Sequence, residues 1–376
     1  MKFLSDGIKS AFTIQAINSF VIGAMTIVIP LLMIERGIAV ESMGLIFAVL
    51  PVISQTARVN FAIISDFIGR KIFYKLNSIL NIIFMGIYYF AHSPIEFLFG
   101  KFAEGVRDAS LWSVNRAYLM DYSYEKKNTL IKLRGFSAIF SAFGTMASGL
   151  FIALLFYENT ILVCMLLSLL VIPYLFNLKD KMRRKVSITS ILKSLDVRGR
   201  KRVFKNFMII FFFTGLGWGL ISGYIFPLFL RLMGYNEQYV GLILGVRTLC
   251  LGIIAYFLAL KFSGKKLVLL GGIFFSISLA LLSFSASSTA FIFIIITGLA
   301  EGLIAASFET IFVKIVNHNS SAGDIGILMF GLHVGTSASL AVSGFIISSI
   351  GFAPMFFVSA VLFAFSSLSS YYTLYG

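Results

Sequence analysis

The feature that most constrains the fold is an internal duplication, because segments of one half of the chain recur in the other half at nearly constant spacing. The matches at an offset of 197 positions are Pro30 with Pro227, Gly37 with Gly234, the run 44–46 with 241–243, and Ala103-Glu104-Gly105 with Ala300-Glu301-Gly302. Gly135 and Gly144 return as Gly326 and Gly335 at an offset of 191. Small drifts of this kind are what loops of different length between fixed helices produce. The sequence therefore predicts two similar units that face each other across a shared interface.

Long apolar stretches recur from one end of the chain to the other. Only 12% of the residues are charged, against about 25% in soluble domains, and each stretch is close to the ~20 residues that cross a bilayer core. Continuous runs of this length favour helices over the alternating segments of a β-barrel. The twelve predicted spans are 11–34, 42–65, 72–91, 94–120, 133–156, 160–177, 206–230, 238–260, 266–285, 289–313, 325–348 and 353–374.

The predicted fold is an all-α polytopic membrane protein with twelve transmembrane helices in two pseudo-symmetric six-helix bundles. The first bundle covers residues 1–178 and the second 206–376, and a basic cytoplasmic linker joins them at 179–205. Such a protein is in contact with the lipid bilayer along its whole circumference. Nothing in the sequence specifies a dimer, and we expect a monomer.

The distribution of basic residues predicts the orientation. The net charge is +15, yet the loops that would face outward hold only Arg36 and Arg231, while eleven Lys and Arg lie between Lys179 and Lys205. This is the positive-inside bias, so we expect a multi-pass protein of the plasma membrane with both termini in the cytoplasm. We expect the basic linker to lie along the anionic headgroups at the membrane surface. Because the positive charge is concentrated there, its placement argues against nucleic-acid binding.

The loop after the second span has the sequence Ser65-Asp66-Phe67-Ile68-Gly69-Arg70-Lys71, with a weaker copy at 264–266. It resembles the signature loop of the major facilitator superfamily, in which an Asp, a Gly and two basic residues follow the second span. The resemblance implies that family's fold and a cytoplasmic latch, in which the Asp docks on the start of the eleventh span and the Arg pairs with an acid at the end of the fourth. The residues assigned to this gate are Asp66, Gly69, Arg70, Lys71, Asp121 and Asp324.

The fourth span carries the densest set of ionisable side chains. At about 100° per residue, Glu104, Asp108 and Asn115 fall within roughly 40° of one another, so one face of this helix is predicted to line water. Ionisable groups at membrane depth are costly and usually mark a transport pathway. Two carboxylates one turn apart resist simultaneous ionisation, which favours proton exchange. The candidates on this span are Lys101, Glu104, Arg107, Asp108, Trp112 and Asn115.

Further candidates for substrate binding or coupling lie on other spans. Arg58 and Arg247 have no carboxylate within four residues of their own helix, which predicts either a binding role or a pair with another helix. A structural hydrogen bond to another helix is the alternative for His333, and packing is the alternative for Trp218. The set is Gln15, Asn18, Arg58, Trp218, Tyr224, Arg247, Glu301, Glu309 and His333.

These features predict a secondary transporter that moves a small organic solute by alternating access, with protons as the coupling ion. Residues 101–105 are similar to a motif of proton-driven drug antiporters, so efflux of amphipathic compounds is the first alternative. A non-transporting sensor or a lipid scramblase is the second. The sequence has no nucleotide-binding loop and no metal-spaced His or Cys cluster, so we expect neither an enzyme nor a cofactor.

Small residues on spans 133–156 and 325–348 suggest that these helices approach their neighbours closely. Either static packing or sliding during transport explains them equally well from the sequence.

Overall fold

The computed structural model describes residues 6–122, 126–179, 200–261, 265–315 and 321–375, and every regular element in these ranges is a helix. We call 6–179 the first half and 200–375 the second half. The first half contains α1 (Asp6–Glu35), α2 (Val40–Ile68), α3 (Lys71–Phe90), α4 (Pro94–Tyr122), α5 (Lys126–Leu169) and α6 (Ile172–Phe176). The second half contains α8 (Arg202–Gly219), α9 (Ile225–Leu232), α10 (Glu237–Lys261), α11 (Lys265–Ser283), α12 (Ser287–Ile315), α13 (Ser321–Ile350) and α14 (Phe352–Tyr375).

All twelve predicted spans lie on these helices. α5 contains the fifth span and most of the sixth, and it bends at Phe156, whose φ is 64°. The seventh span is divided into α8 and α9 by a short break that contains Gly223 at φ 67°. By length and apolar composition alone, eight of the described helices qualify as membrane-crossing. α4 falls outside that set because it carries the charged side chains discussed below.

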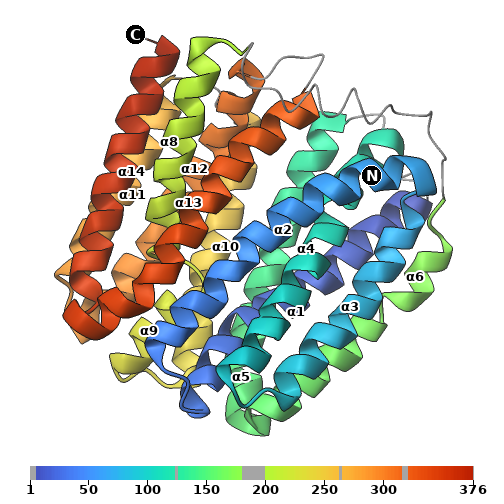
Figure 1. Ribbon diagram of the computed structural model, residues 1–376, viewed down its shortest axis with the longest axis horizontal. Helices are drawn as coiled ribbons and strands as arrows, with labels where there is room; N and C mark the ends of the chain where they lie inside the picture. The colour runs from blue at the N-terminus through green and yellow to red at the C-terminus, as the bar shows by residue number, and fades with distance from the viewer. Residues whose placement is uncertain (1–5, 123–125, 180–199, 262–264, 316–320, 376) are drawn as a thin grey trace.

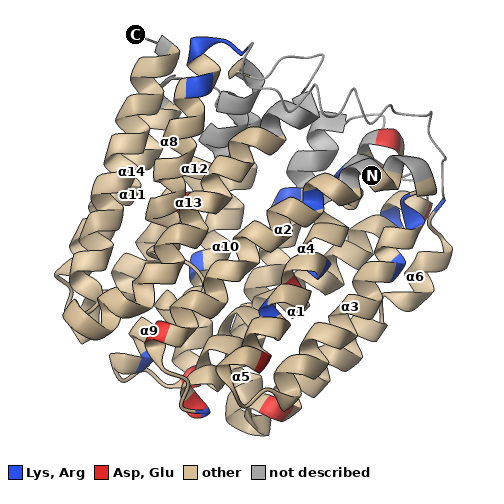
Figure 2. Ribbon diagram, viewed as in Figure 1, with Lys and Arg blue, Asp and Glu red and all other residues tan. Residues whose placement is uncertain are grey.

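The two halves lie side by side, with the labelled N- and C-terminal ends on the same side of the molecule (Figure 1). An even number of crossings produces this placement. Charged positions are sparse in the middle of the helices (Figure 2). We call the opposite ends, near the turns at Gly37 and Gly234, the external ends, following the predicted topology.

The duplication in the sequence is visible in the packing within each half. Gly37 and Gly234, which match at the offset of 197, both have positive φ, at 69° and 90°. In the first half α1 packs along α5, and in the second half α8 packs along α13. A Cβ at Gly144 of α5 would lie 1.9 Å from the carbonyl oxygen of Phe20, and one at Gly335 of α13 would lie 2.2 Å from that of Phe212. Matched glycines therefore admit matched backbone contacts.

Two helix pairs make most of the contacts between the halves in the described residues: α2 with α13 and α5 with α10. On the first seam, a Cβ at Gly344 would lie 2.3 Å from the carbonyl oxygen of Val40 at the external end. Further along the same seam, Gln55 Nε2 donates a hydrogen bond of 3.2 Å to the carbonyl oxygen of Gly326. On the second seam, a Cβ at Gly149 would lie 2.5 Å from the carbonyl oxygen of Glu237. The halves are thus in close contact at their external ends on both sides.

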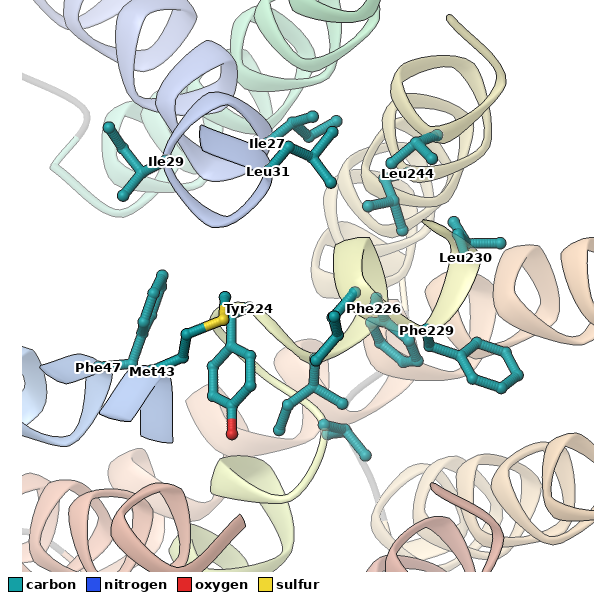
Figure 3. Packing of buried hydrophobic residues seen from close by; sticks show 14 of the residues in the cluster. Ile27, Ile29, Leu31, Met43, Phe47, Tyr224, Phe226, Phe229, Leu230 and Leu244 are labelled. Atoms are coloured by element: carbon teal, nitrogen blue, oxygen red, sulfur yellow. The ribbon is translucent and has the colours of Figure 1, made fainter. Parts of the chain in front are cut away.

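An apolar cluster fills the space between the halves at the same level. The buried side chains labelled in Figure 3 come from α1, α2, the α8–α9 break, α9 and α10, and the cluster extends from there into both halves. Phe47 of α2 and Tyr224 of the break face each other with ring centroids 5.3 Å apart. Burial of this many apolar side chains excludes water from the external side. The structure is therefore closed at its external end.

Candidate functional site

The middle of the first half holds an ion pair between two helices. Asp108 stands at the midpoint of α4, and its carboxylate pairs with the guanidinium of Arg58 on α2. The Arg58 side chain is 13% exposed and that of Asp108 is 32% exposed. Trp112 lies one turn further along α4, with Arg58 4.5 Å and Arg116 5.0 Å from its ring centroid. Two cations thus lie beside one aromatic ring, and Trp112 itself is 39% exposed.

His333 on α13 brings the second half close to this pair. α13 packs against α2, the helix of the first half that carries Arg58. His333 Nδ1 is 2.6 Å from the carbonyl oxygen of Met329, one turn earlier in the same helix. This bond lies within α13, whereas the structural alternative expected from the sequence was a hydrogen bond to another helix. His333 nevertheless lies where the two halves meet in the middle of the bundle.

The second half has an ion pair of the same kind. Glu301 stands at the midpoint of α12 and pairs with Arg247 on α10. Arg247 Nε also donates a hydrogen bond of 3.1 Å to Thr297 Oγ1, and its guanidinium lies 4.8 Å from the ring centroid of Phe226. The side chains are 14% and 18% exposed, so this pair is the less accessible of the two. Arg58 and Arg247 thus both form cross-helix pairs, one of the two roles expected for them.

Glu104, which matches Glu301 in the repeat, has different partners. It accepts hydrogen bonds from Lys101 Nζ at 2.7 Å and from the Tyr88 hydroxyl at 2.6 Å. Lys101 Nζ also lies 4.1 Å from the ring centroid of Phe47, which belongs to the external apolar cluster. The Lys101–Glu104 pair therefore supports the external closure. Although Glu104 and Asp108 are one turn apart on α4, each is held by its own cation.

Arg107 points into the interior of the first half. Its guanidinium donates 2.6 Å and 2.8 Å hydrogen bonds to the amide oxygens of Asn81 and Asn18, and the Asn77 side chain donates to its backbone carbonyl at 3.0 Å. Arg107 is 1% exposed, and within the described part of the chain no carboxylate lies at ion-pair distance from it. The sequence placed Arg107 and Asn18 at the site, whereas the structure places them among α1, α3 and α4. Neutral amides hold this buried cation.

Gln15 and Asn115 belong to a second buried network. Asn115 donates to the Gln15 side-chain oxygen at 2.7 Å and accepts from the Tyr74 hydroxyl at 2.8 Å. Gln15 Nε2 in turn donates to Ser137 of α5 at 3.1 Å. The sequence reading missed Tyr74, Ser137, Asn77 and Asn81, because a single polar residue in an apolar span gives no indication of its partner.

Trp218 and Tyr224, the two aromatic candidates of the second half, lie in different parts of the structure. Trp218 packs between Phe275 and Phe363, with ring centroids 5.4 Å and 5.2 Å away, in the interior of the second half. Tyr224 is fully buried in the external closure, and its hydroxyl is 2.8 Å from Ser343 Oγ. Packing therefore explains Trp218, and Tyr224 is part of the external contact between the halves.

The predicted gate lies at the other end of the helices. Arg70 and Asp121 form a buried ion pair of 2.7 Å between the start of α3 and the end of α4. Gly69 has a φ of 90° at the turn between α2 and α3, and Lys71 Nζ donates to the carbonyl oxygen of Phe176 at 3.3 Å. The side chains of Asp66, Asp324 and Glu309 lie outside the described residues. The Arg70–Asp121 contact is the one implied by the resemblance, and its role in gating remains a prediction.

Comparison with known proteins agrees with this architecture. The family model of the major facilitator superfamily matches residues 11–260 and 207–375. The chain belongs to the major facilitator superfamily. It is therefore a multi-pass membrane protein and a secondary transporter of a small solute, and it is not an enzyme.

Solved structures show the same fold at low sequence identity. A crystal structure of a mutant of the nucleoside transporter NupG superposes with a TM-score of 0.80 at 13% identity, covering 98% of this chain and 100% of that one. Another crystal structure of NupG gives 0.73 at 14% identity, with 97% and 98% covered. No curated protein matches significantly. These similarities establish the fold, and they carry no information about the substrate.

Proposed function

We propose that the protein moves a small organic solute across the plasma membrane by alternating access, coupled to protons through Asp108. The observation that carries this proposal is the Arg58–Asp108 pair at the midpoint of α4. The pair is partly exposed, and Arg58 belongs to α2, which packs against α13 of the other half. Ionisable groups at this depth are costly, which favours a functional role for a pair that water can reach.

The chemistry follows from the pairing. While Asp108 is ionised, it neutralises Arg58 and holds that guanidinium toward α4. A proton on Asp108 removes this attraction and leaves Arg58 as a donor for an acceptor group of the solute. The proton binds Asp108 and the solute binds Arg58, so each of them separates the ion pair. Binding of one therefore favours binding of the other. Rocking of the halves would change the surroundings of the pair, since α2, which carries Arg58, packs against α13 of the opposite half.

Glu301 and Glu104 are weaker candidates for the coupling residue. Both carboxylates are less exposed than that of Asp108, at 18% and 17%. Glu104 also accepts a hydrogen bond from the Tyr88 hydroxyl, and Arg247, the partner of Glu301, also donates one to Thr297. We assign them a structural part in holding α10 to α12 and in supporting the external closure.

The surroundings of Asp108 favour uptake over efflux. Arg58 and Arg116 both lie beside Trp112, a wall suited to a solute with acceptor groups and a flat apolar face. The motif at 101–105 suggested drug efflux, but its two charged side chains, Lys101 and Glu104, pair with each other. We therefore propose proton-coupled uptake, in a monomer with both termini in the cytoplasm.

The test is solute flux into proteoliposomes under an imposed pH gradient, with a panel of labelled nucleosides, sugars, organic acids and amphipathic drugs. Asp108→Asn should reduce gradient-driven accumulation to the level of empty vesicles while preserving exchange of the solute at equal pH. Glu96→Gln, at an exposed position of the same helix, is the matched control and should behave as wild type. Unchanged gradient dependence in Asp108→Asn would remove this residue from the mechanism. Absence of flux for every solute would favour a sensor, and movement of labelled lipid would favour a scramblase.

A further inference from the structure

A lateral groove with a volume of ≈ 560 Å³ lies between α2, α8 and α13, away from the proposed site. α2 contributes Thr56 and Asn60, α8 contributes Ile209 and Phe212, and α13 contributes Phe330. Its walls are almost entirely apolar, and four of these five side chains are exposed. A hollow with such walls suits an apolar ligand group.

The groove opens toward the bilayer and not toward the space between the halves. Thr56 is two residues before Arg58, which places it about 200° around α2 from the side that pairs with α4. Leu45 lies within about 20° of Thr56 on the same helix and is 49% exposed. The wall that α2 gives to the groove is therefore the lipid-facing side of that helix.

Basic residues continue the groove toward the predicted cytoplasmic surface. Lys205 is one turn before Ile209 and two turns before Phe212, so it stands on the stripe of α8 that lines the groove. Lys201 precedes it by another turn, and both lysines are exposed. Ile209 lies about 10 Å inside the start of α8, at 1.5 Å per residue. The surface thus has an apolar channel with positive charge at its mouth.

We propose that this groove binds an anionic phospholipid, with an acyl chain against Ile209, Phe212 and Phe330 and the phosphate at Lys201 and Lys205. Asn60 lies on the groove wall and can donate to an ester oxygen of the lipid. An anionic headgroup suits the basic mouth, because lysines at this level attract the negatively charged leaflet. The ligand class follows from three features: positive charge at the mouth, a polar side chain on the wall and an apolar channel.

Occupancy of this groove would depend on the arrangement of the halves. α2 belongs to the first half, whereas α8 and α13 belong to the second, and the Gln55–Gly326 hydrogen bond crosses between them beside the groove. A lipid that contacts both halves favours the arrangement in which the groove has this shape. The inference goes beyond the proposed function, since it concerns a ligand other than the solute.

The test measures lipid binding to the purified protein by native mass spectrometry, with phosphatidylglycerol and phosphatidylcholine of identical chains. Wild type should retain phosphatidylglycerol preferentially. The double variant Lys201→Gln/Lys205→Gln should lose roughly 30-fold in apparent affinity for phosphatidylglycerol, the effect of two lysine charges near an anionic surface, with little change for phosphatidylcholine. The matched control is Lys9→Gln/Lys75→Gln, which removes two exposed charges elsewhere on the predicted cytoplasmic side and should bind as wild type.

A second variant tests the apolar part of the site. A Cβ at Gly326 meets no atom within 4 Å, so Gly326→Leu places a side chain in open space at the groove while preserving the carbonyl that Gln55 binds. It should weaken binding of both lipids. Equal retention of the two lipids by wild type, equal loss in the Lys9/Lys75 control, or undiminished binding in Gly326→Leu would each overturn the proposal. Competition by the transported solute instead of by lipid would show that the groove is a solute entrance.

Discussion

The α1–α5 interface and the α2–α13 interface are packed with similar closeness. The first lies within one half of the molecule, whereas the second joins the two halves. A Cβ at Gly144 would lie 1.9 Å from the carbonyl oxygen of Phe20, within the first half. A Cβ at Gly344 would lie 2.3 Å from the carbonyl oxygen of Val40, across the two halves. In both places the helix backbones are too close for any side chain.

The difference lies in what each interface must do during transport. Under the proposed rocking mechanism, α1 and α5 move together, so their contact persists in every conformation. The external part of the α2–α13 contact exists only while the external side is closed. The same Gly→Ala substitution should therefore unfold the protein at one interface and redistribute its conformations at the other.

The largest expected effect is that of Gly144→Ala. The new methyl group meets backbone atoms that cannot turn away, so α1 and α5 must separate along their length. Overpacking commonly costs about 1–3 kcal/mol, and a backbone clash this close belongs at or above the upper end. We expect a strong loss of folded protein and of thermal stability, measured by size-exclusion yield and by the unfolding midpoint. Gly335→Ala, the repeat-related position against Phe212, should behave in the same way.

Gly86→Ala is the control for that experiment. Gly86 also lies within a membrane helix, but a Cβ there would meet only the terminal methyl of Met165, at 4.0 Å. Alanine is the better helix former, so stability should remain unchanged or rise slightly. Equal stability of Gly144→Ala and Gly86→Ala would show that the α1–α5 contact is not a fixed part of the first half.

The second prediction concerns Gly344→Ala. The substitution should lower the stability of the externally closed arrangement while the protein remains folded. Met43→Cys, in the external apolar cluster, provides the readout after Cys164 and Cys250 are replaced by serine. We expect its labelling by an external thiol reagent to rise roughly tenfold, which corresponds to a shift of about 1.4 kcal/mol. If Gly344→Ala instead reduces the amount of folded protein and the remaining protein is labelled as before, the Gly344 contact is a fixed structural contact, as proposed for Gly144.

Much of this fold was accessible from the sequence, because the duplication and the apolar spans are local patterns with a fixed physical meaning. All twelve predicted spans lie on helices, and matched residues such as Gly37 and Gly234 adopt matched conformations. The predicted spans 133–156 and 160–177 place a break directly after Phe156, and the structure has a kink at that residue inside α5. The sequence could not show that this break is a kink in one helix, since no glycine or proline marks it. The sequence could also not assign the small residues of α5 to packing or to sliding, because that depends on the neighbour of each one.

The candidate site was less predictable, because its chemistry depends on pairs formed between helices. Periodicity placed Glu104 and Asp108 on one face of α4, but it could not show that Lys101 holds one and Arg58 the other. Arg107 is adjacent to Asp108 in sequence and yet points into the bundle among asparagines. Depth and helical face are encoded locally, whereas the partner of a polar side chain is fixed only by the packing of whole helices.

The smallest expected effect is at the external hydrogen bond between the halves. The Tyr157 hydroxyl donates to Glu237 Oε1 at 3.3 Å, and Glu237 also pairs with Arg231 at 3.0 Å within the second half. Tyr157→Phe removes only the contact that crosses the halves, and a net hydrogen bond is worth about 1 kcal/mol or less at this length. Labelling of Met43→Cys should therefore rise about two- to fivefold, less than in Gly344→Ala.

The matched control is Tyr235→Phe, because the Tyr235 hydroxyl also donates at the external surface, to the carbonyl oxygen of Ser287 at 2.5 Å, but both residues belong to the second half. Its loss should leave labelling unchanged, since a bond within one half has the same strength in every arrangement of the two halves. Equal labelling in the two tyrosine variants would mean that external hydrogen bonds do not select the closed state. The apolar cluster around Phe47 and Tyr224 and the close backbone contacts would then maintain the closure without them.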